Sequence, residues 1–227
     1  MKISEAAGVH PVDDIAREAL KRLPVRPGDA VLDLGCGTGV YGLATRLLGA
    51  ETVRMTDLDP KAIRCARANS RQNKLDGVSF CVGDFFSRLG GLRFDLIIAN
   101  LPQTPGPVPF LLSKWGGLDG TAHLRRLFRE APRHLMPRGR LFFLLLDLAD
   151  SRRITDLASR RFTLQVVHRM RREFEPEEYD HYHPGLFAYL DKLRERGISR
   201  FYGRGRRRWF HLRFIVARLK PRGDTQA

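Results

Sequence analysis

Cysteine is scarce in this chain of 227 residues, which contains only Cys36, Cys65 and Cys81. None of the three is part of a C-x-x-C pair, and none falls in a cluster with histidine. This pattern argues against a disulfide framework and offers no set of zinc ligands. We therefore expect no bound metal.

Long apolar runs are also missing. The longest, residues 141–146, stops at Asp147 and is far too short to cross a bilayer. The first residues lack the apolar stretch of a secretory signal peptide. We therefore expect no membrane partner and a cytoplasmic location.

Acidic residues are few in the last part of the chain. The formal net charge is +15, and the segment from Arg196 onward holds ten Lys and Arg residues but one acidic residue, Asp224. A basic segment of this kind can bind RNA, DNA or another polyanion, although a solvated basic surface has the same composition. The length and the 43% hydrophobic content predict a single domain, residues 1–227, with a sizeable core.

Hydrophobic spacing alternates between strand-like and helix-like along the chain. It predicts strands at residues 30–34, 52–56, 78–82, 94–99, 140–147, 162–168 and 209–219. It predicts helices at residues 12–23 (within an N-terminal helical segment, 1–25), 40–48, 60–73, 122–135 and 151–159. The order of these elements predicts an α/β fold with a Rossmann-like, doubly wound, seven-stranded and mostly parallel sheet.

The first predicted strand runs directly into three glycines at alternate positions, Gly35, Gly37 and Gly39. Glycines at such a place let the backbone turn tightly and lie close against a ligand. Asp57 ends the second strand, eighteen residues after Gly39, near the offset at which an acidic residue reaches a ribose hydroxyl. A carboxylate and a ring follow the third strand, at residues 84–85, where they could contact an adenine.

The spacing of the glycines separates two kinds of nucleotide site. A phosphate-binding G-x-G-x-x-G loop that starts with Gly35 and Gly37 needs a third glycine at position 40, where this chain has valine, and the motif D-L-G-C-G-T-G follows a different pattern. Together with T-D-L-D-P (56–60) and G-D-F (83–85), it resembles the motifs of class I methyltransferases that use S-adenosylmethionine (SAM). The resemblance covers about residues 28–148. An NAD-type Rossmann enzyme and an inactive relative are the alternatives.

The resemblance implies a class I methyltransferase fold and a role for each matching residue. The glycine loop would approach the methionine part of SAM, Asp33 would orient the loop and the methionine amine, and Asp57 would hold the ribose. The implied cofactor-binding residues are Asp33, Gly35, Cys36, Gly37, Gly39, Asp57, Leu58, Asp84, Phe85 and Asn100. Nothing near Cys36 marks it as a reactive thiolate, so we expect it to be a small loop residue.

The fourth predicted strand ends in Asn100-Leu101-Pro102-Gln103, which resembles the N-P-P-Y motif of amino methyltransferases. The resemblance implies that the Asn100 side-chain carbonyl and the Leu101 backbone carbonyl accept the hydrogens of an acceptor nitrogen, orienting its lone pair. The motif departs from the family at Leu101 and at Gln103, where an aromatic residue is usual. Gln103 can donate and accept hydrogen bonds, which favours a polar, non-aromatic acceptor. For Asn100, a turn residue that satisfies its own backbone is the alternative.

Three further stretches resemble HemK-type protein-glutamine methyltransferases. They are the G-G-L-D-G segment at 116–120, the L-M-P-R-G-R segment at 135–140, and Asn69 in its predicted helix. The chain departs from those enzymes in having only about 25 residues before the first strand. It also departs in a long connection, residues 169–208.

That connection is predicted to be a substrate-specific insertion before the last strand, because long connections often carry function. It begins acidic, contains a predicted helix at 186–196, and ends very basic. Four of its side chains could shape a pocket for a cationic or amino-acid-like acceptor, the two histidines serving as bases: Tyr179, His181, Tyr182 and His183. A solvated loop is the alternative.

The sequence is compatible with three functions. The first is a SAM-dependent methyltransferase acting on an amide or amine nitrogen of a small molecule or of a peptide or protein side chain. The second is an RNA or DNA base methyltransferase that uses the basic C-terminal region. The third is a non-catalytic module with the SAM-binding fold.

Overall fold

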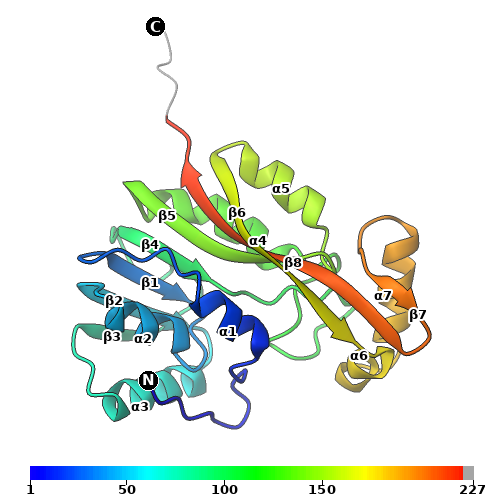
Figure 1. Cartoon of the computed structure of the whole chain (residues 1–227), viewed down its shortest axis with the longest axis horizontal. Helices are drawn as coiled ribbons and strands as arrows, with labels where there is room; N and C mark the ends of the chain where they lie inside the picture. Colours follow the sequence, from blue (N-terminus) through cyan, green and yellow to red (C-terminus); the bar gives the residue numbers. More distant parts are fainter. Residues whose placement is uncertain (222–227) are drawn as a thin grey trace, which may run out of the picture.

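The computed structural model describes residues 1–221, and a mixed sheet runs through its centre (Figure 1). The order of the sheet is β3-β2-β1-β4-β5-β8-β6, and a short strand, β7, also pairs with β8. The strands are β1 (Ala30–Leu34), β2 (Thr52–Asp57), β3 (Val78–Val82), β4 (Phe94–Ala99), β5 (Leu135–Leu146), β6 (Phe162–Phe174), β7 (Tyr202–Arg204) and β8 (Arg207–Leu219).

Strands β1 to β5 run parallel to one another. Strand β8 is antiparallel to β5, β6 and β7. The predicted α/β fold with a mostly parallel sheet is therefore confirmed. The strand count differs from the prediction, since the sheet has eight strands and not seven. The additional strand is β7, which is only three residues long and carries too short a pattern to predict.

Helices cover both faces of the sheet. They are α1 (Asp14–Leu20), α2 (Val40–Leu47), α3 (Pro60–Gln72), α4 (Ala122–Glu130), α5 (Ser151–Ser159), α6 (Pro176–Tyr182) and α7 (Leu186–Glu195), with a 3-10 turn, η1 (Ala131–Arg133). None of these helices is long and apolar enough to span a membrane.

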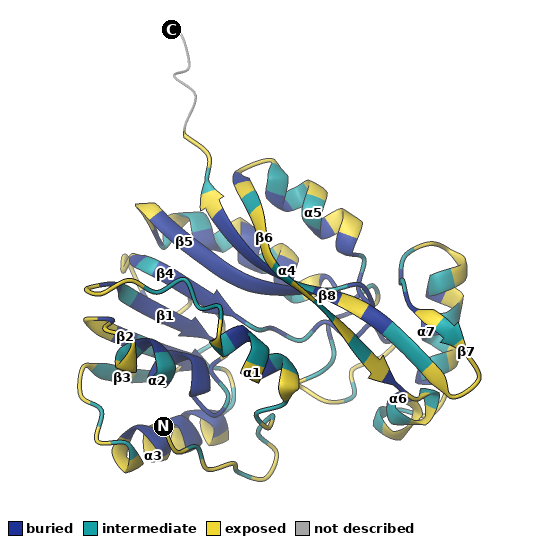
Figure 2. Ribbon diagram, viewed as in Figure 1, coloured by how far each residue is buried: buried dark blue, intermediate teal, exposed yellow. Residues whose placement is uncertain are grey.

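Two apolar cores lie on opposite faces of the sheet, because alternate side chains of a strand point to opposite sides. In β4, Leu96 and Ile98 pack into one core with α1, α2, α3, α6 and α7. The intervening Ile97 and Ala99 pack into the other core with α4 and α5. Figure 2 shows the result, with the central strands largely buried along their length.

Helix α1 is shorter than the predicted helix at 12–23. Asp13 forms its N-cap and accepts a hydrogen bond from the backbone N–H of Ala16, which fixes the helix start. The residues before it are not helical, and they lie along α3, where Asn69 exchanges hydrogen bonds with the backbone of Ser4 at 2.8 and 2.9 Å. The N-terminal segment 1–25 is therefore helical only over these seven residues.

The last strands are longer than predicted. β6 continues from 168 to Phe174, and β8 begins at Arg207. In the extension of β6, Met170 and Phe174 share one face with Arg172, and charged residues occupy the other face. The extension of β8 consists of Arg207 and Arg208 alone, so its charge hid the start of this strand. β5 likewise begins at Leu135, because the predicted helix at 122–135 ends at Glu130.

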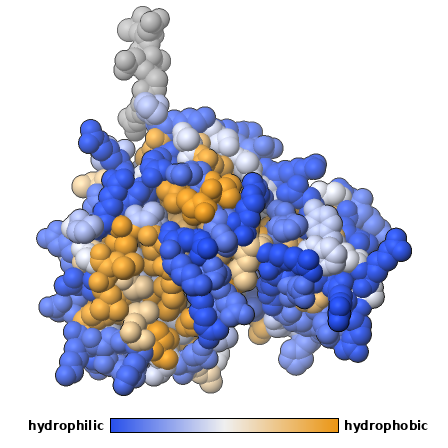
Figure 3. Space-filling view, viewed as in Figure 1, coloured by the Kyte–Doolittle hydropathy of each residue, from blue (hydrophilic) through white to orange (hydrophobic). Residues whose placement is uncertain are grey.

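The connection 169–208 is folded and packed against the sheet, which excludes the solvated-loop alternative. Buried side chains of α6, α7 and the adjoining chain share the core on the α1 face; they are Phe174, Tyr179, Leu186, Leu190 and Phe201. The outer surface over α7 and β7 is mostly hydrophilic in the view of Figure 3. Arg222 and Asp224, which belong to the predicted basic segment, lie outside the described residues.

Candidate functional site

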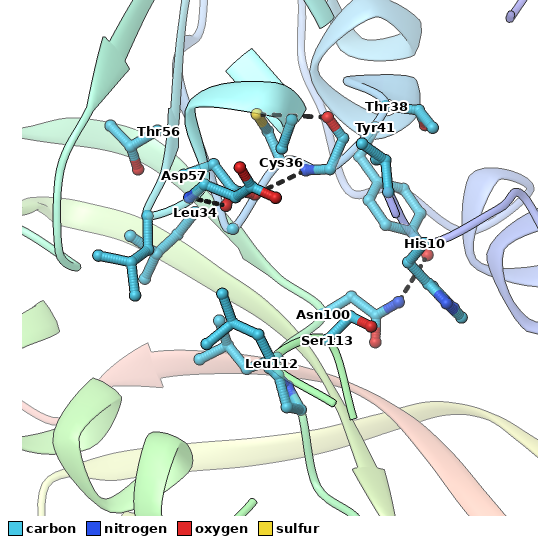
Figure 4. A pocket seen from close by; sticks show the side chains of 18 of the residues that line it. His10, Leu34, Cys36, Thr38, Tyr41, Thr56, Asp57, Asn100, Leu112 and Ser113 are labelled. Atoms are coloured by element: carbon cyan, nitrogen blue, oxygen red, sulfur yellow. Dashed lines mark hydrogen bonds between the residues drawn. The ribbon is translucent and has the colours of Figure 1, made fainter. Parts of the chain in front are cut away.

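The carboxyl ends of β1, β2, β3 and β4 meet at one edge of the sheet. The loops that follow them line a pocket, called here the first pocket (Figure 4), together with residues 8–12 of the N-terminal segment and residues 112–113. Ligands of open α/β sheets bind at this edge. The predicted glycine loop, the residues that end β2 and β3, and the loop after β4 therefore come together in one cavity.

The three loop glycines all have positive φ angles, 72° at Gly35, 54° at Gly37 and 81° at Gly39. Only glycine adopts this backbone region without strain. At Gly39 a Cβ would also lie 2.9 Å from the Cβ of Ala66 on α3. The loop can therefore hold its backbone against the first pocket only because these positions carry no side chain.

Asp57 fixes the loop from the neighbouring strand. One of its carboxylate oxygens accepts the N–H of Gly37 at 2.9 Å, and the other accepts the N–H of Asp59 at 2.9 Å. Burial raises the pKa of Asp57 above its usual value. Beside it, the hydroxyl of Thr56 is buried in the pocket wall with no hydrogen-bond partner within residues 1–221, so a polar ligand group here would meet an unsatisfied partner.

Asp33 lies beneath the loop and does not line the first pocket. Its side chain is buried, and one carboxylate oxygen accepts the N–H of Gly42 in α2 at 2.8 Å. Burial raises the pKa of Asp33 to about 7. Its geometry therefore supports the first part of its expected role, orienting the loop, and places it out of contact with the cavity.

Cys36 lines the first pocket and is buried. Burial, followed by the nearby carboxylates of Asp33 and Asp57, raises the pKa of its thiol. A thiol in these surroundings stays protonated and is a poor nucleophile.

The residues that follow β3 form one wall of the pocket. Phe85 has a positive φ of 52°, and its ring is stacked with His123, the centroids being 5.9 Å apart. Arg126 lies over the same ring at 4.3 Å and holds both carboxylate oxygens of Asp84, at 2.7 and 2.8 Å. The expected adenine contact from Asp84 therefore competes with an ion pair that no sequence motif indicated.

Two large apolar side chains stand exposed at the pocket. Leu58 is 52% exposed and Leu112 is 64% exposed. Exposed apolar side chains beside a cavity favour contact with a flat apolar group. Leu58 was predicted from its place after Asp57, whereas Leu112 lies in a loop in which no motif indicated it.

Asn100 directly follows β4 and lines both the first pocket and a second, adjoining one. Its side-chain N–H donates to the hydroxyl of Tyr41 at 3.2 Å, the contact drawn in Figure 4. The side-chain oxygen is therefore directed away from Tyr41 and is free to accept a hydrogen bond. This arrangement differs from a turn residue that bonds its own backbone.

Gln103 lines the second pocket, but its side-chain amide is engaged within the protein. It is 3% exposed, and its amide N–H groups donate to the backbone oxygens of Leu101, at 3.3 Å, and Leu144, at 3.0 Å. Its oxygen accepts the N–H of Leu146 at 3.0 Å. Gln103 thus ties the loop after β4 to the end of β5, and the expectation of a polar, non-aromatic acceptor stays a prediction.

The G-G-L-D-G segment supports the same loop. A Cβ at Gly116 would lie 2.7 Å from the Cα of Gln103, and a Cβ at Gly120 would overlap the backbone oxygen of Gln103. Asp119 accepts hydrogen bonds from the hydroxyl and the N–H of Thr121, at 2.6 and 3.0 Å. These glycines are therefore explained by close backbone packing on the Asn100–Gln103 loop.

The second pocket shares five lining residues with the first: His10, Asn100, Leu101, Pro102 and Ser113. Its remaining wall is mixed, with apolar side chains (Ile15, Leu146 and Phe210) beside polar and charged ones: Asp13, Gln103, Thr104, Lys114, Arg172, Glu178, Tyr179 and Tyr182. Two of the four insertion residues predicted to bind substrate, Tyr179 and Tyr182, therefore reach the site.

The other two do not. His181 is exposed and His183 is partly buried, and neither lines the first or the second pocket. Both lie on or just after the last turn of α6, where the side chains of Tyr179 and Tyr182 occupy the inward face. A role for these histidines as bases has no geometric support.

Three basic and aromatic residues, Arg171, Tyr202 and Trp209, lie on the opposite face of the sheet from the second pocket. Arg172 lines that pocket, whereas its neighbour Arg171 lies over the ring of Trp209 at 4.4 Å. Tyr202 stacks on Trp209 with centroids 6.1 Å apart and is 45% exposed. An aromatic and basic surface therefore exists, with the sheet between it and Asn100.

The order of the strands, the antiparallel β8 and the glycine loop at the end of β1 together define the class I methyltransferase fold. A sequence profile of the methyltransferase small domain family matches residues 2–168, and the chain belongs to this family.

Ribosomal protein L11 methyltransferase of Bacillus cereus (strain G9842) is 44% identical over 96 residues, which are 41% of this chain and 30% of that protein. The corresponding protein of Bacillus cytotoxicus is 45% identical over 96 residues. The chain thus matches less than a third of the length of these relatives. The closeness to HemK-type enzymes stays a prediction.

Solved structures agree on the fold. Ribosomal protein L11 methylase from Lactobacillus delbrueckii subsp. bulgaricus superimposes with a TM-score of 0.56 at 20% identity, over 90% of this chain and 76% of that one. Precorrin-6y C5,15-methyltransferase from Geobacter metallireducens GS-15 gives 0.58 at 12% identity, over 95% and 92%. At these identities the likeness concerns the fold alone.

Proposed function

We propose that this chain is a SAM-dependent N-methyltransferase that acts on an amine or amide nitrogen. The observation that carries the proposal is the position of Asn100, Leu101 and Pro102 in the walls of both pockets. SAM would occupy the first pocket and the acceptor the second. The methyl group would pass between them at the side-chain oxygen of Asn100.

The residues of the first pocket fit SAM. The glycine loop leaves backbone exposed where the methionine part would lie, and Asp57 presents a carboxylate to the ribose while it holds the loop. Leu58, Leu112 and the ring of Phe85 give apolar surface for adenine. When bound, SAM supplies a methyl group on a positively charged sulfur, which is electrophilic without help from a metal.

Asn100 would orient the acceptor. Its side-chain oxygen, left free by the contact of its N–H with Tyr41, can accept a hydrogen from the acceptor nitrogen and stabilise the charge that develops there. The Leu101 backbone oxygen is available only in part, because it also accepts from Gln103 at 3.3 Å. We therefore expect Asn100 to contribute more than Leu101 to the orientation of the acceptor nitrogen.

The kind of acceptor is supported by two observations that point in different directions. The named relatives methylate ribosomal protein L11 according to their names, which supports a peptide or protein acceptor, but they share only part of their length with this chain. A small molecule is favoured by the second pocket, which α6 and the N-terminal segment help to enclose.

RNA base methylation is the second candidate function, and the surface formed by Arg171, Tyr202 and Trp209 favours it, since arginines and aromatic rings bind phosphates and bases. The sheet separates that surface from Asn100, which argues against the delivery of a base from it to the site. A third possibility is a non-catalytic module with the SAM-binding fold, and absent SAM binding would support it.

Calorimetry with SAM and a transfer assay test the proposal together. We expect the wild-type chain to bind SAM and Asp57→Ala to bind it at least about tenfold more weakly, since the loop loses its anchor. Asn100→Ala should keep SAM binding and lose about 100-fold in turnover. The assay uses labelled SAM with separate pools of protein, RNA and amino acids. Absence of SAM binding would disprove the proposal, and label in RNA alone would establish the second candidate.

A further inference from the structure

The second pocket contains charged side chains of both signs, and one pair of them is already matched. Arg172 forms an ion pair with Glu178, and the hydroxyl of Tyr182 also donates to Glu178 at 3.2 Å. The carboxylate and the guanidinium therefore largely offset one another. Neither is left as the main charge that a ligand would meet.

Lys114 is the cation of the pocket that has no such match. Within residues 1–221 no carboxylate lies within ion-pair distance of its ammonium group, which sits over the ring of Tyr182 at 5.4 Å. The side chain is partly buried. Burial, and then the nearby charge of Arg172, lower the pKa of Lys114, while the carboxylates of Asp13 and Glu178 offset part of this shift from beyond ion-pair distance.

The backbone holds Lys114 beside the loop that carries Asn100. The carbonyl oxygen of Lys114 accepts the N–H of Thr104 at 2.9 Å, and Thr104 in turn accepts the N–H of Gly116 at 2.8 Å. These hydrogen bonds fix the backbone of Lys114 beside the second pocket, which Asn100 also lines. A ligand whose nitrogen lies at Asn100 and whose anionic group lies at Lys114 would span this small cavity.

The nature of the anion follows from the charge available. A single ammonium group matches one negative charge, whereas a phosphate dianion would call for a second free cation or for backbone N–H donors. Arg172 is already paired, and Asp13 on the same wall would repel a dianion about twice as strongly as a monoanion. A carboxylate is therefore the better match.

We propose that the methyl acceptor is a small amine or amide that also carries a carboxylate, with its nitrogen at Asn100 and its carboxylate bound by Lys114. This inference rests on the proposed function. In the transfer step, the lone pair of the nitrogen forms the new N–C bond as the C–S bond breaks towards sulfur. One N–H proton passes to water, and an amine acceptor must be neutral when it reacts.

The test offers labelled SAM with free amino acids and dipeptides, and in parallel with the carboxamide derivatives of the same compounds. We expect label in the carboxylates and at least about tenfold less in the carboxamides. For the best acceptor, Lys114→Met should raise KM by about 10- to 100-fold, the range for the loss of a charged hydrogen bond, with little change in kcat. Lys114→Arg should restore much of the binding, and Lys61→Met, an exposed lysine on α3, should act as wild type.

The outcomes separate the two proposals. If the wild-type chain fails to bind SAM, the proposed function itself is wrong. If SAM binds but carboxylates and carboxamides are methylated equally, or label enters only protein or RNA, or no compound of the panel is labelled, the acceptor class is wrong. The comparison of carboxylate with carboxamide uses the wild-type chain alone, so it decides the matter even if Lys114→Met does not fold.

Discussion

The side-chain N–H of Asn100 donates a hydrogen bond to the hydroxyl of Tyr41, with 3.2 Å between the two atoms. Tyr41 lies on α2, directly after the glycine loop, and is 5% exposed. The contact joins the helix that follows β1 to the first residue after β4. It also determines which end of the Asn100 amide faces the pockets, so it links the cofactor half of the site to the acceptor half.

Tyr41→Phe removes this hydroxyl and keeps the ring. We expect kcat to fall about 3- to 10-fold, since a neutral hydrogen bond contributes roughly 1 kcal/mol, while the affinity for SAM changes less than about twofold. Transfer kinetics and calorimetry measure the two effects. Tyr189→Phe is the matched control, because that hydroxyl bonds the backbone of Leu118 outside both pockets. Equal kcat in Tyr41→Phe and wild type would contradict the assigned orientation.

Gln103→Leu tests the structural role of Gln103, the residue at which the motif differs from the family pattern. The change leaves the backbone groups of Leu144 and Leu146 without their partner in a buried place, and each unsatisfied group costs about 1–3 kcal/mol. We expect the free energy of unfolding to fall by about 2–4 kcal/mol in chemical denaturation. Gln165→Leu, at an exposed position, should change it by about 0.5 kcal/mol or less. A stable Gln103→Leu protein with lost activity would instead favour a contact with substrate.

The parts of the site that could be predicted are those encoded by short, local patterns. Gly35, Gly37 and Gly39 had to be glycine for reasons of φ angle and close packing, and Asp57 was placed by the end of its strand. Parallel strands bring their carboxyl ends to one edge of the sheet, so these residues meet whatever the rest of the chain does.

The parts that could not be predicted depend on contacts between distant segments. Arg126 holds Asp84 across 42 positions, and Lys114 reaches the second pocket from a loop with no motif of its own. Gln103 matched a motif position, but its neighbours in β5 decided where its amide points. The extension of β6 to Phe174 could have been found in part, because Met170 and Phe174 occupy positions of one strand face, although Arg172 interrupts the alternation between them.

Asp147→Ala tests whether the insertion depends on the core of the sheet. Asp147 is 8% exposed, and one of its carboxylate oxygens accepts from Arg200, Arg213 and the hydroxyl of Ser151 at 2.9–3.1 Å. Removing it leaves two guanidinium groups without their anion, which costs about 3–5 kcal/mol when the pair is fully buried.

Because Arg200 is 33% exposed, we expect a smaller loss in unfolding free energy, about 2–3 kcal/mol. Hydrogen exchange should increase first in β7 and at the start of β8. Asp156→Ala on the outer side of α5 serves as the control. An unchanged stability would show that the insertion is held by its apolar contacts alone.

Asp33→Asn tests the effect of a buried carboxyl group on the stability of the fold. Burial raises the pKa of Asp33 from 3.8 to about 7 in the folded chain. Between about pH 4 and pH 7, Asp33 is therefore protonated in the folded state and ionised in the unfolded state. The unfolded chain therefore binds fewer protons, and the contribution of Asp33 to stability falls as pH rises from about 4 to 7 and is constant above.

Each pKa unit corresponds to about 1.36 kcal/mol. The asparagine introduced by Asp33→Asn would be neutral at every pH and could still accept the N–H of Gly42. We therefore expect the stability of wild type minus that of Asp33→Asn to fall by about 2–3 kcal/mol between about pH 5 and pH 8, measured by urea denaturation. Taking the difference between the two proteins removes the contributions of all other titrating groups. Asp156→Asn, on the surface, should give no comparable slope. A difference that is independent of pH would mean that Asp33 is ionised in the fold throughout this range, and that the glycine loop rests on a charged carboxylate.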